Sequence, residues 1–233
     1  MKKLGFIMKK HKDLIFILNN MKILFNIIPI ISYNIATLIM YKLSKYHNNK
    51  LYNKYTGWSR LQIIFCVPFL FIKYYDINSI ASDLIYLNSF GCGISVHIFY
   101  ILSNYKVLDI LASRSLNKFK IYNYFIRYKI IIHLIADGIL HWTPAYISYL
   151  YIDYHQTYTY KKYIWIIPAS SHVIYPYLLT GHFNPTTLYE INIVYPEWKY
   201  ILGWILTFIS YFTILNLQSL FLHPSHKLDK CSL

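Results

Sequence analysis

Three side chains that can exchange protons recur at a constant spacing past the middle of the chain. His133, Asp137 and His141 follow one another at intervals of four residues. In an α-helix each such step turns the side chain by only about 40°, so the three lie along one stripe. A carboxylate beside an imidazole fixes the tautomer and orientation of that ring. The spacing therefore fits an embedded general base, half of a metal site or a proton relay.

The same stripe has a structural interpretation. An aspartate and two histidines can satisfy one another's hydrogen bonds where helices meet inside a membrane. The functional and the structural interpretation both stay open on these residues alone.

A second group of candidates lies further along the chain. Ser170, Ser171 and His172 precede the segment Tyr175-Pro176-Tyr177. We expect His172 to be a further acid–base group. Ser171 is a conceivable nucleophile, although serines in spanning helices more often bond a backbone carbonyl of their own helix. His97 is a third embedded histidine site.

The sequence predicts neither a metal nor a cofactor. The chain has 10 histidines, but they are scattered and form no short HxxxH or HxxHH pair within one apolar run. The cysteines Cys66, Cys92 and Cys231 are widely spaced and form no CxxC pair. Neither a disulfide framework nor a structural zinc site is therefore expected.

The composition defines the setting of these residues. Of the 233 residues 56% are hydrophobic, 19% aromatic and 14% charged, and the mean hydropathy is +0.34. Ordinary soluble domains carry roughly a quarter charged residues. A soluble enzyme of this size would leave too much apolar surface in water, and a disordered chain would need low hydrophobicity. Both classes are excluded.

Apolar runs of about 20 residues are long enough to cross the hydrocarbon layer as helices. We therefore predict an all-α, polytopic transmembrane bundle of about six helices. A basic N-terminal tail (1–22) and a C-terminal tail (223–233) flank one transmembrane domain (23–222). Within that domain the expected spans are 23–41, 61–75, 80–102, 129–151, 163–180 and 200–222. The stretch 106–127 is expected to form an amphipathic helix at the interface.

The positive charge of the chain indicates contact with lipid headgroups. Lys and Arg number 23 against 9 Asp and Glu, which gives a net charge of +14. These charges lie between apolar runs, as in loops and helix ends that meet anionic headgroups. We expect membrane lipids as partners and no nucleic acid. The basic loops nearly balance across the membrane, so the positive-inside rule leaves the orientation open.

Three short motifs resemble a known family. Tyr55-Thr56-Gly57-Trp58 opens the second apolar run, Gly138-Ile139-Leu140-His141-Trp142-Thr143 lies in the fourth, and Tyr175-Pro176-Tyr177-Leu178 lies in the fifth. In this order they resemble the androgen-induced-gene family of membrane threonine hydrolases, over about residues 51–222. The resemblance implies a six-helix fold and hydrolysis of fatty acid esters of hydroxy fatty acids by an intramembrane threonine and histidine.

The resemblance also implies roles for individual residues. His141 matches the catalytic histidine and would be the general base, with Asp137 orienting a histidine. The position of the threonine falls on Gln62, which cannot be a nucleophile. Ser59 or Thr56 would take that role after a shift of register. An activated hydroxyl needs a base within hydrogen-bond reach.

Two classes of function remain open for this integral, multi-pass membrane protein. The first is a lipid-ester hydrolase with the embedded histidine site, whose substrate reaches the site from within the bilayer. The second is a non-catalytic scaffold, or a small transporter or proton relay that uses the same polar stripe. Transporters often contain inverted repeats, and the sequence shows none, which counts mildly against a transporter.

Overall fold

The structure is a computed structural model that describes residues 2–47, 55–72, 76–118, 128–150, 161–181 and 196–222. These residues are 94% helical and contain seven α-helices and no strand. The predicted all-α class is confirmed for this part of the chain.

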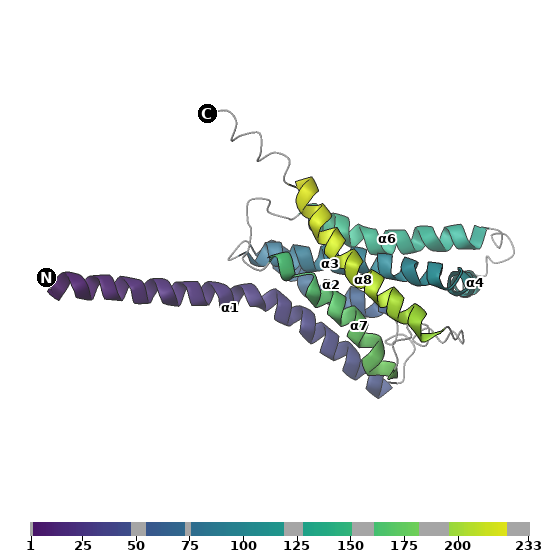
Figure 1. The fold of residues 1–233 in the computed structure, drawn as a ribbon, viewed down its shortest axis with the longest axis horizontal. Coiled ribbons are helices and arrows are strands. Elements are labelled where there is room, and N and C mark those ends of the chain that lie inside the picture. The colour runs from purple at the N-terminus through teal and green to yellow at the C-terminus, as the bar shows by residue number, and fades with distance from the viewer. Residues whose placement is uncertain are drawn as a thin grey trace, which may run out of the picture.

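Figure 1 shows how the helices are arranged. In chain order the elements are α1 (Lys2–His47), α2 (Tyr55–Cys66), the 3₁₀ turn η1 (Val67–Phe71), α3 (Ile77–Leu102), α4 (Lys106–Lys118), α6 (Lys129–Leu150), the 3₁₀ turn η3 (Lys161–Tyr163), α7 (Ile166–Thr180) and α8 (Glu197–Leu222).

Helix α3 is the central helix of the bundle. It contacts α1, α2, α4, α6, α7 and α8, and it is the most buried of the long apolar helices. Small residues on α3 allow its neighbours to approach closely. At Gly91 the ring of Tyr211 from α8 occupies the space that a side chain would fill.

Four helical segments are long and apolar enough to cross a membrane: Ile15–Ile39, Ile77–Leu102, Lys129–Ser148 and Glu197–Leu217. They correspond to the first, third, fourth and sixth predicted spans. The second predicted span coincides with the shorter apolar segment Gly57–Phe71. The fifth coincides with α7, whose 15 residues are about 22 Å long. The total of six spans stays a prediction.

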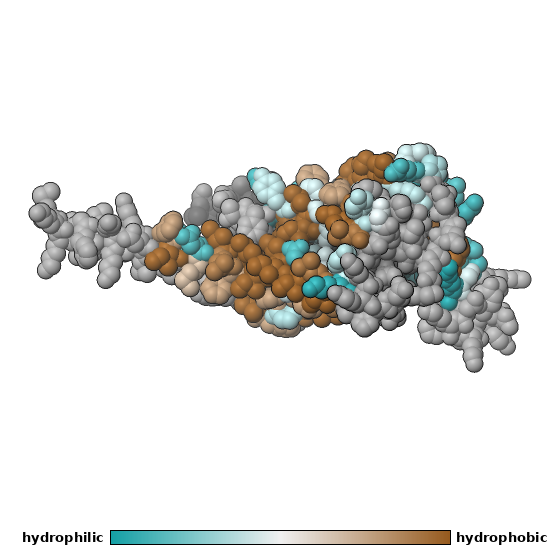
Figure 2. All heavy atoms as spheres, turned by 90° about the horizontal axis from the view of Figure 1, so that it is seen from below, coloured by the Kyte–Doolittle hydropathy of each residue, from teal (hydrophilic) through white to brown (hydrophobic). Residues whose placement is uncertain are grey.

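The outer faces of the long helices are apolar. Figure 2 shows a broad hydrophobic patch over the middle of the face that it presents. Exposed isoleucines recur every four residues on α6 (Ile131, Ile135, Ile139) and on α8 (Ile201, Ile205, Ile209). A soluble monomer rarely exposes such continuous apolar faces. They are compatible with contact to lipid.

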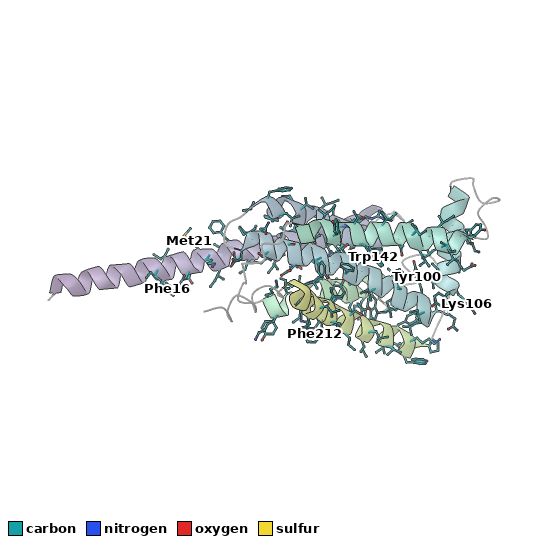
Figure 3. The ribbon with its side chains drawn as sticks, turned by 90° about the horizontal axis from the view of Figure 1, so that it is seen from above. Phe16, Met21, Tyr100, Lys106, Trp142 and Phe212 are labelled. Atoms are coloured by element: carbon teal, nitrogen blue, oxygen red, sulfur yellow. The ribbon has the colours of Figure 1, made fainter. Side chains whose placement is uncertain are left out.

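Helix α1 reaches beyond the rest of the bundle. It is continuous from Lys2 to His47. Residues 2–22 of the predicted N-terminal tail (1–22) therefore form the first part of this helix. Its N-terminal part projects from the bundle, with Phe16 and Met21 on the projecting part (Figure 3). Further along α1, Asn26 donates a hydrogen bond to Asp76 Oδ2 at 3.4 Å. That contact attaches α1 to the start of α3. The predicted C-terminal tail (223–233) lies outside the described residues.

Helix α4 contributes to the packing of α3 and α6. Its side chains Val107 and Leu108 are buried against Tyr100 of α3 and Leu134 of α6. The stretch 106–118 is helical, as predicted, and its buried apolar side chains contact protein. The remainder of the predicted interfacial helix (119–127) lies outside the described residues.

Candidate functional site

The predicted polar stripe of α6 faces the central helix. Asp137 and His141 are buried, with 9% and 5% of their surface exposed, and His133 is half-buried. All three belong to one uninterrupted helix. The period of four residues therefore places ionisable side chains against α3, inside the bundle.

A tyrosine of α3 links the members of this stripe. The hydroxyl oxygen of Tyr100 lies 3.4 Å from Oδ2 of Asp137 and 3.4 Å from Nε2 of His133. On the other side of Asp137, Oδ1 lies 3.7 Å from Nε2 of His141. These separations exceed the optimum of about 2.7–3.0 Å for hydrogen bonds between oxygen and nitrogen or oxygen atoms. We call the series His133–Tyr100–Asp137–His141 the polar chain.

Tyr100 was not among the residues predicted for the site. It lies 33 residues from His133 in sequence, and no local pattern distinguishes it from the other tyrosines, of which the chain has 26 in all. The only available signal was its place near the end of an apolar run, 3 residues after His97.

Two features of α3 hold α6 close. A Cβ atom at Gly93 would lie only 3.1 Å from Cβ of His141, so glycine permits the close contact. The hydroxyl of Ser89, one turn earlier, donates to the backbone carbonyl of His141. His97 lies outside the polar chain, because its Nδ1 pairs with the Gly93 carbonyl at 2.7 Å. Its ring packs edge-on against Tyr100.

The structure places His172 in a different contact. Its ring on α7 is fully buried, and Nδ1 is hydrogen-bonded to the hydroxyl of Tyr211 on α8. The two ring centroids are 5.6 Å apart. The predicted fourth acid–base residue therefore belongs to a neighbouring pair rather than to the polar chain itself.

Ser59 belongs to a buried network of neutral hydrogen bonds. Its hydroxyl donates to Asn88 Oδ1 at 2.8 Å, and Asn88 Nδ2 donates to Gln62 Oε1 at 2.9 Å. Gln62 Nε2 then donates to Thr37 Oγ1 at 2.8 Å and to Ser171 Oγ at 3.1 Å. The network joins α1, α2, α3 and α7. Gln62, at the position that the resemblance assigns to a nucleophile, is fully buried at its centre.

Ser59, one of the two predicted nucleophiles, has no hydrogen bond to a base among the described residues. In the described part of the chain the Ser59 hydroxyl meets the amide of Asn88 and no imidazole. Thr56 lies in the first turn of α2, but its side chain lies outside the described residues. Ser171, the third hydroxyl considered, bonds the carbonyl of Pro168 at 3.0 Å and the hydroxyl of Tyr33 at 3.1 Å. The nucleophile roles stay predictions.

The described residues contain no group of three or more His, Cys, Asp or Glu side chains placed to hold a metal ion. Cys66 and Cys92 are buried thiols without a disulfide bond. The Asp, His and Tyr side chains of the polar chain can exchange protons.

Comparisons of the chain with protein-family models, with curated proteins and with solved structures gave no match.

Proposed function

We propose that the chain is a multi-pass membrane protein that moves protons along the polar chain. The observation that carries this proposal is the position of the Tyr100 hydroxyl, 3.4 Å from groups of both His133 and Asp137. A hydroxyl both donates and accepts hydrogen bonds. It can therefore pass a proton between the imidazole of His133 and the carboxylate of Asp137.

The free-energy cost of burying ionisable side chains such as Asp137 and His141 supports a functional role for the polar chain. Ionisable side chains inside a membrane are expensive, and series of Asp, Glu and His are typical of proton relays. Asp137 and His141 are buried in a segment that is otherwise long and apolar enough to span. A structural contact between helices needs only neutral polar groups, and the Ser59–Gln62 network already provides one.

The polar chain covers part of the membrane thickness. From His133 to His141 there are eight residues of helix, or about 12 Å of the roughly 30 Å hydrocarbon layer. Other groups must carry the proton over the remaining distance.

Proton flux into liposomes tests the proposal. The purified full chain is reconstituted in vesicles that contain a pH-sensitive dye, and a potassium gradient with valinomycin sets the membrane potential. We expect potential-driven flux with the wild type and none above protein-free vesicles with Asp137→Asn.

Asp109→Asn is the matched control. Asp109 lies on α4, pairs with Lys129 at 2.7 Å and has a half-exposed side chain, so this variant should keep the wild-type flux. Wild-type vesicles that are no more permeable to protons than empty ones would refute the proposal. If Asp137→Asn then changed only the yield of folded protein, the stripe would be a structural contact, as in a scaffold.

A lipid-ester hydrolase is a second candidate, supported by the state of His141. Among the described residues its buried Nε2 forms no hydrogen bond, so it can accept a proton from a nucleophile. Ser59 contacts α3 at Asn88, and His141 contacts α3 at Ser89 and Gly93. Both residues therefore meet the same two turns of α3. The substrate would be a lipid ester dissolved in the bilayer.

Activity-based labelling distinguishes the hydrolase from the relay. A lipid-like fluorophosphonate should label the membrane-expressed wild type, and His141→Ala should abolish the labelling. Loss of labelling in Ser59→Ala would assign the nucleophile. Absence of labelling in folded wild-type protein would reject this candidate and leave the relay intact.

A further inference from the structure

Helix α1 packs on the bundle with one face. It lies at the edge of the bundle (Figure 1). Among its described side chains the buried ones are Asn26, Pro29, Tyr33 and Ala36, which are spaced by three and four residues, as neighbours on one side of a helix are. On this face the Tyr33 hydroxyl lies 3.1 Å from Oγ of Ser171 on α7. The opposite side of α1 is directed away from α7.

The side of α1 that is directed away from the bundle carries a regular series of exposed residues. Ile31 lies about 160° around the helix from Tyr33. Exposed residues recur from there at intervals of three, four and seven residues, which is the period of helices that pair along their length. The described exposed members of this series are Ile17, Asn20, Met21, Leu24, Ile31, Asn34, Ile35 and Leu38. We call them the outer face of α1.

Two asparagines occupy equivalent positions on the outer face. Asn20 and Asn34 each follow an exposed isoleucine, Ile17 and Ile31, by three residues. The outer face contains no charged residue. The single charged residue between residues 15 and 39 is Lys22, and its Nζ lies 3.6 Å from Asp76 of the α3 start.

Asn34 places an exposed amide inside an apolar segment, since Ile15–Ile39 is long and apolar enough to span a membrane. Its Nδ2 donates to the Ile30 carbonyl of its own helix at 2.9 Å. A side-chain amide has a second N–H and an acceptor oxygen for further hydrogen bonds. Hydrocarbon offers no water to satisfy such groups, and asparagines of spanning helices form hydrogen bonds to neighbouring helices. A partner with polar groups at this depth is therefore favoured over lipid.

We propose that the outer face of α1 pairs with the same face of a second copy of this chain within the bilayer, and that the two Asn34 amides hydrogen-bond each other. Copies inserted in the same orientation can be related by a two-fold axis along the membrane normal. Each residue beside that axis then meets its own counterpart. Because an amide both donates and accepts, two asparagines satisfy each other reciprocally.

The outer face is self-complementary in this arrangement. Pairing in register brings Leu24, Ile31 and Leu38 against their own counterparts, and Asn20 and Asn34 against theirs. A single polar position in such a series fixes the register of two helices. The bundle lies on the opposite side of α1, so it does not obstruct the approach. The pairing goes beyond the proton-moving function and does not depend on it.

Energy transfer between labelled copies in liposomes tests the pairing. Full-length chains that carry a donor or an acceptor dye at the N-terminus are reconstituted together and diluted with increasing amounts of lipid. We expect more transfer than randomly distributed proteins give, and an apparent dissociation constant that rises about threefold to tenfold in Asn34→Leu. Wild-type transfer at the random value would overturn the proposal and leave lipid alone on this face.

Asn216→Leu is the matched control for Asn34→Leu. Asn216 is an exposed asparagine of α8, and its Nδ2 also donates to a carbonyl four residues earlier, that of Phe212 at 2.9 Å. This variant should keep the apparent dissociation constant within about twofold of the wild type. In detergent that separates the copies, both variants should unfold as the wild type does. Unchanged pairing in Asn34→Leu, or equal loss in both variants, would contradict the role of Asn34.

Disulfide cross-linking locates the contact on α1. In full-length chains whose Cys66, Cys92 and Cys231 are replaced by alanine, single cysteines are introduced and oxidised in the membrane with copper phenanthroline. Ile31→Cys should give covalent dimers, whereas Ile209→Cys, at an exposed position of α8, should stay at the background level. Equal cross-linking at the two positions would overturn a specific contact through the outer face of α1.

Discussion

Tyr100 of α3 and Asp137 of α6 meet across the helix interface, with the phenol oxygen 3.4 Å from Oδ2 of the carboxylate. The same oxygen is equally far from Nε2 of His133. A single side chain of the central helix therefore connects two residues that α6 alone holds a full turn apart. This contact converts a periodic stripe into a continuous series of acid–base groups.

Removing the Tyr100 hydroxyl should interrupt proton flux with little effect on folding. Tyr100→Phe keeps the ring, which packs with Val107 and Leu108 of α4. We expect flux to fall by about tenfold or more, and the free energy of unfolding to fall by about 1 kcal/mol. Tyr105→Phe is the control, because Tyr105 is 55% exposed. Liposome flux and thermal unfolding measure both effects, and normal flux in Tyr100→Phe would show that Tyr100 is not in the path.

The glycine opposite His141 should not tolerate a methyl group. In Gly93→Ala the new Cβ atom would lie 3.1 Å from Cβ of His141, so His141 must give way slightly, and we expect a cost of about 1–3 kcal/mol. At Gly138 of α6 a Cβ atom would meet nothing within 4 Å. Gly138→Ala should therefore stabilise the helix, by up to about 1 kcal/mol. Unfolding in mixed detergent measures the two variants, and equal stabilities would contradict the observed contact between α3 and α6.

Gln62 should matter for stability rather than for proton movement. Gln62→Leu removes the centre of the neutral network and leaves the buried Asn88 without the acceptor of its 2.9 Å bond. We expect a loss of about 1–3 kcal/mol and unchanged flux per folded molecule. Asn34→Leu is the control, because its exposed amide bonds the Ile30 carbonyl of its own helix. A loss of flux in well-folded Gln62→Leu would place the neutral network in the proton path.

The ion pair between Asp83 and Lys161 should contribute more to stability than the pair between Asp109 and Lys129. The Asp83 side chain is 1% exposed, and its Oδ2 lies 3.6 Å from Nζ of Lys161. Replacing it by asparagine removes the charge of a buried carboxylate from its pair, at a cost of about 3 kcal/mol, whereas Lys129 of the other pair also donates a hydrogen bond to Ser113 Oγ at 3.0 Å. Asp109 is half-exposed, so Asp109→Asn should cost at most about 1 kcal/mol. Chemical unfolding of the two variants at several salt concentrations tests this order, and a larger loss in Asp109→Asn would contradict it.

Local periodicity predicts the helical parts of this fold well. The stripe His133–Asp137–His141 follows from the helical period alone, and the structure places it against α3. The first span differs at its start, because the apolar helical segment already includes Ile15, whereas the predicted span starts at residue 23. Lys22 lies 3.6 Å from Asp76 of the α3 start, so its charge has a partner within the protein.

Contacts between distant segments could not be predicted in this way. Tyr100 reaches Asp137 over 37 residues, Tyr211 reaches His172 over 39, and Gln62 reaches Ser171 over 109. Each contact depends on how the helices pack around α3, which a single sequence does not encode in its local pattern. For the same reason the sequence suggested Ser59 as a nucleophile without revealing that its hydroxyl points to Asn88.

The most direct test of the proposed relay is the current through planar bilayers that contain the full chain, measured at several pH gradients. A proton pathway predicts a reversal potential that moves by about 59 mV per pH unit, and the loss of this current in Asp137→Asn but not in Asp109→Asn. A wild-type current equal to that of protein-free bilayers, or a reversal potential that ignores the pH gradient, would contradict the assignment of proton movement to His133, Tyr100, Asp137 and His141.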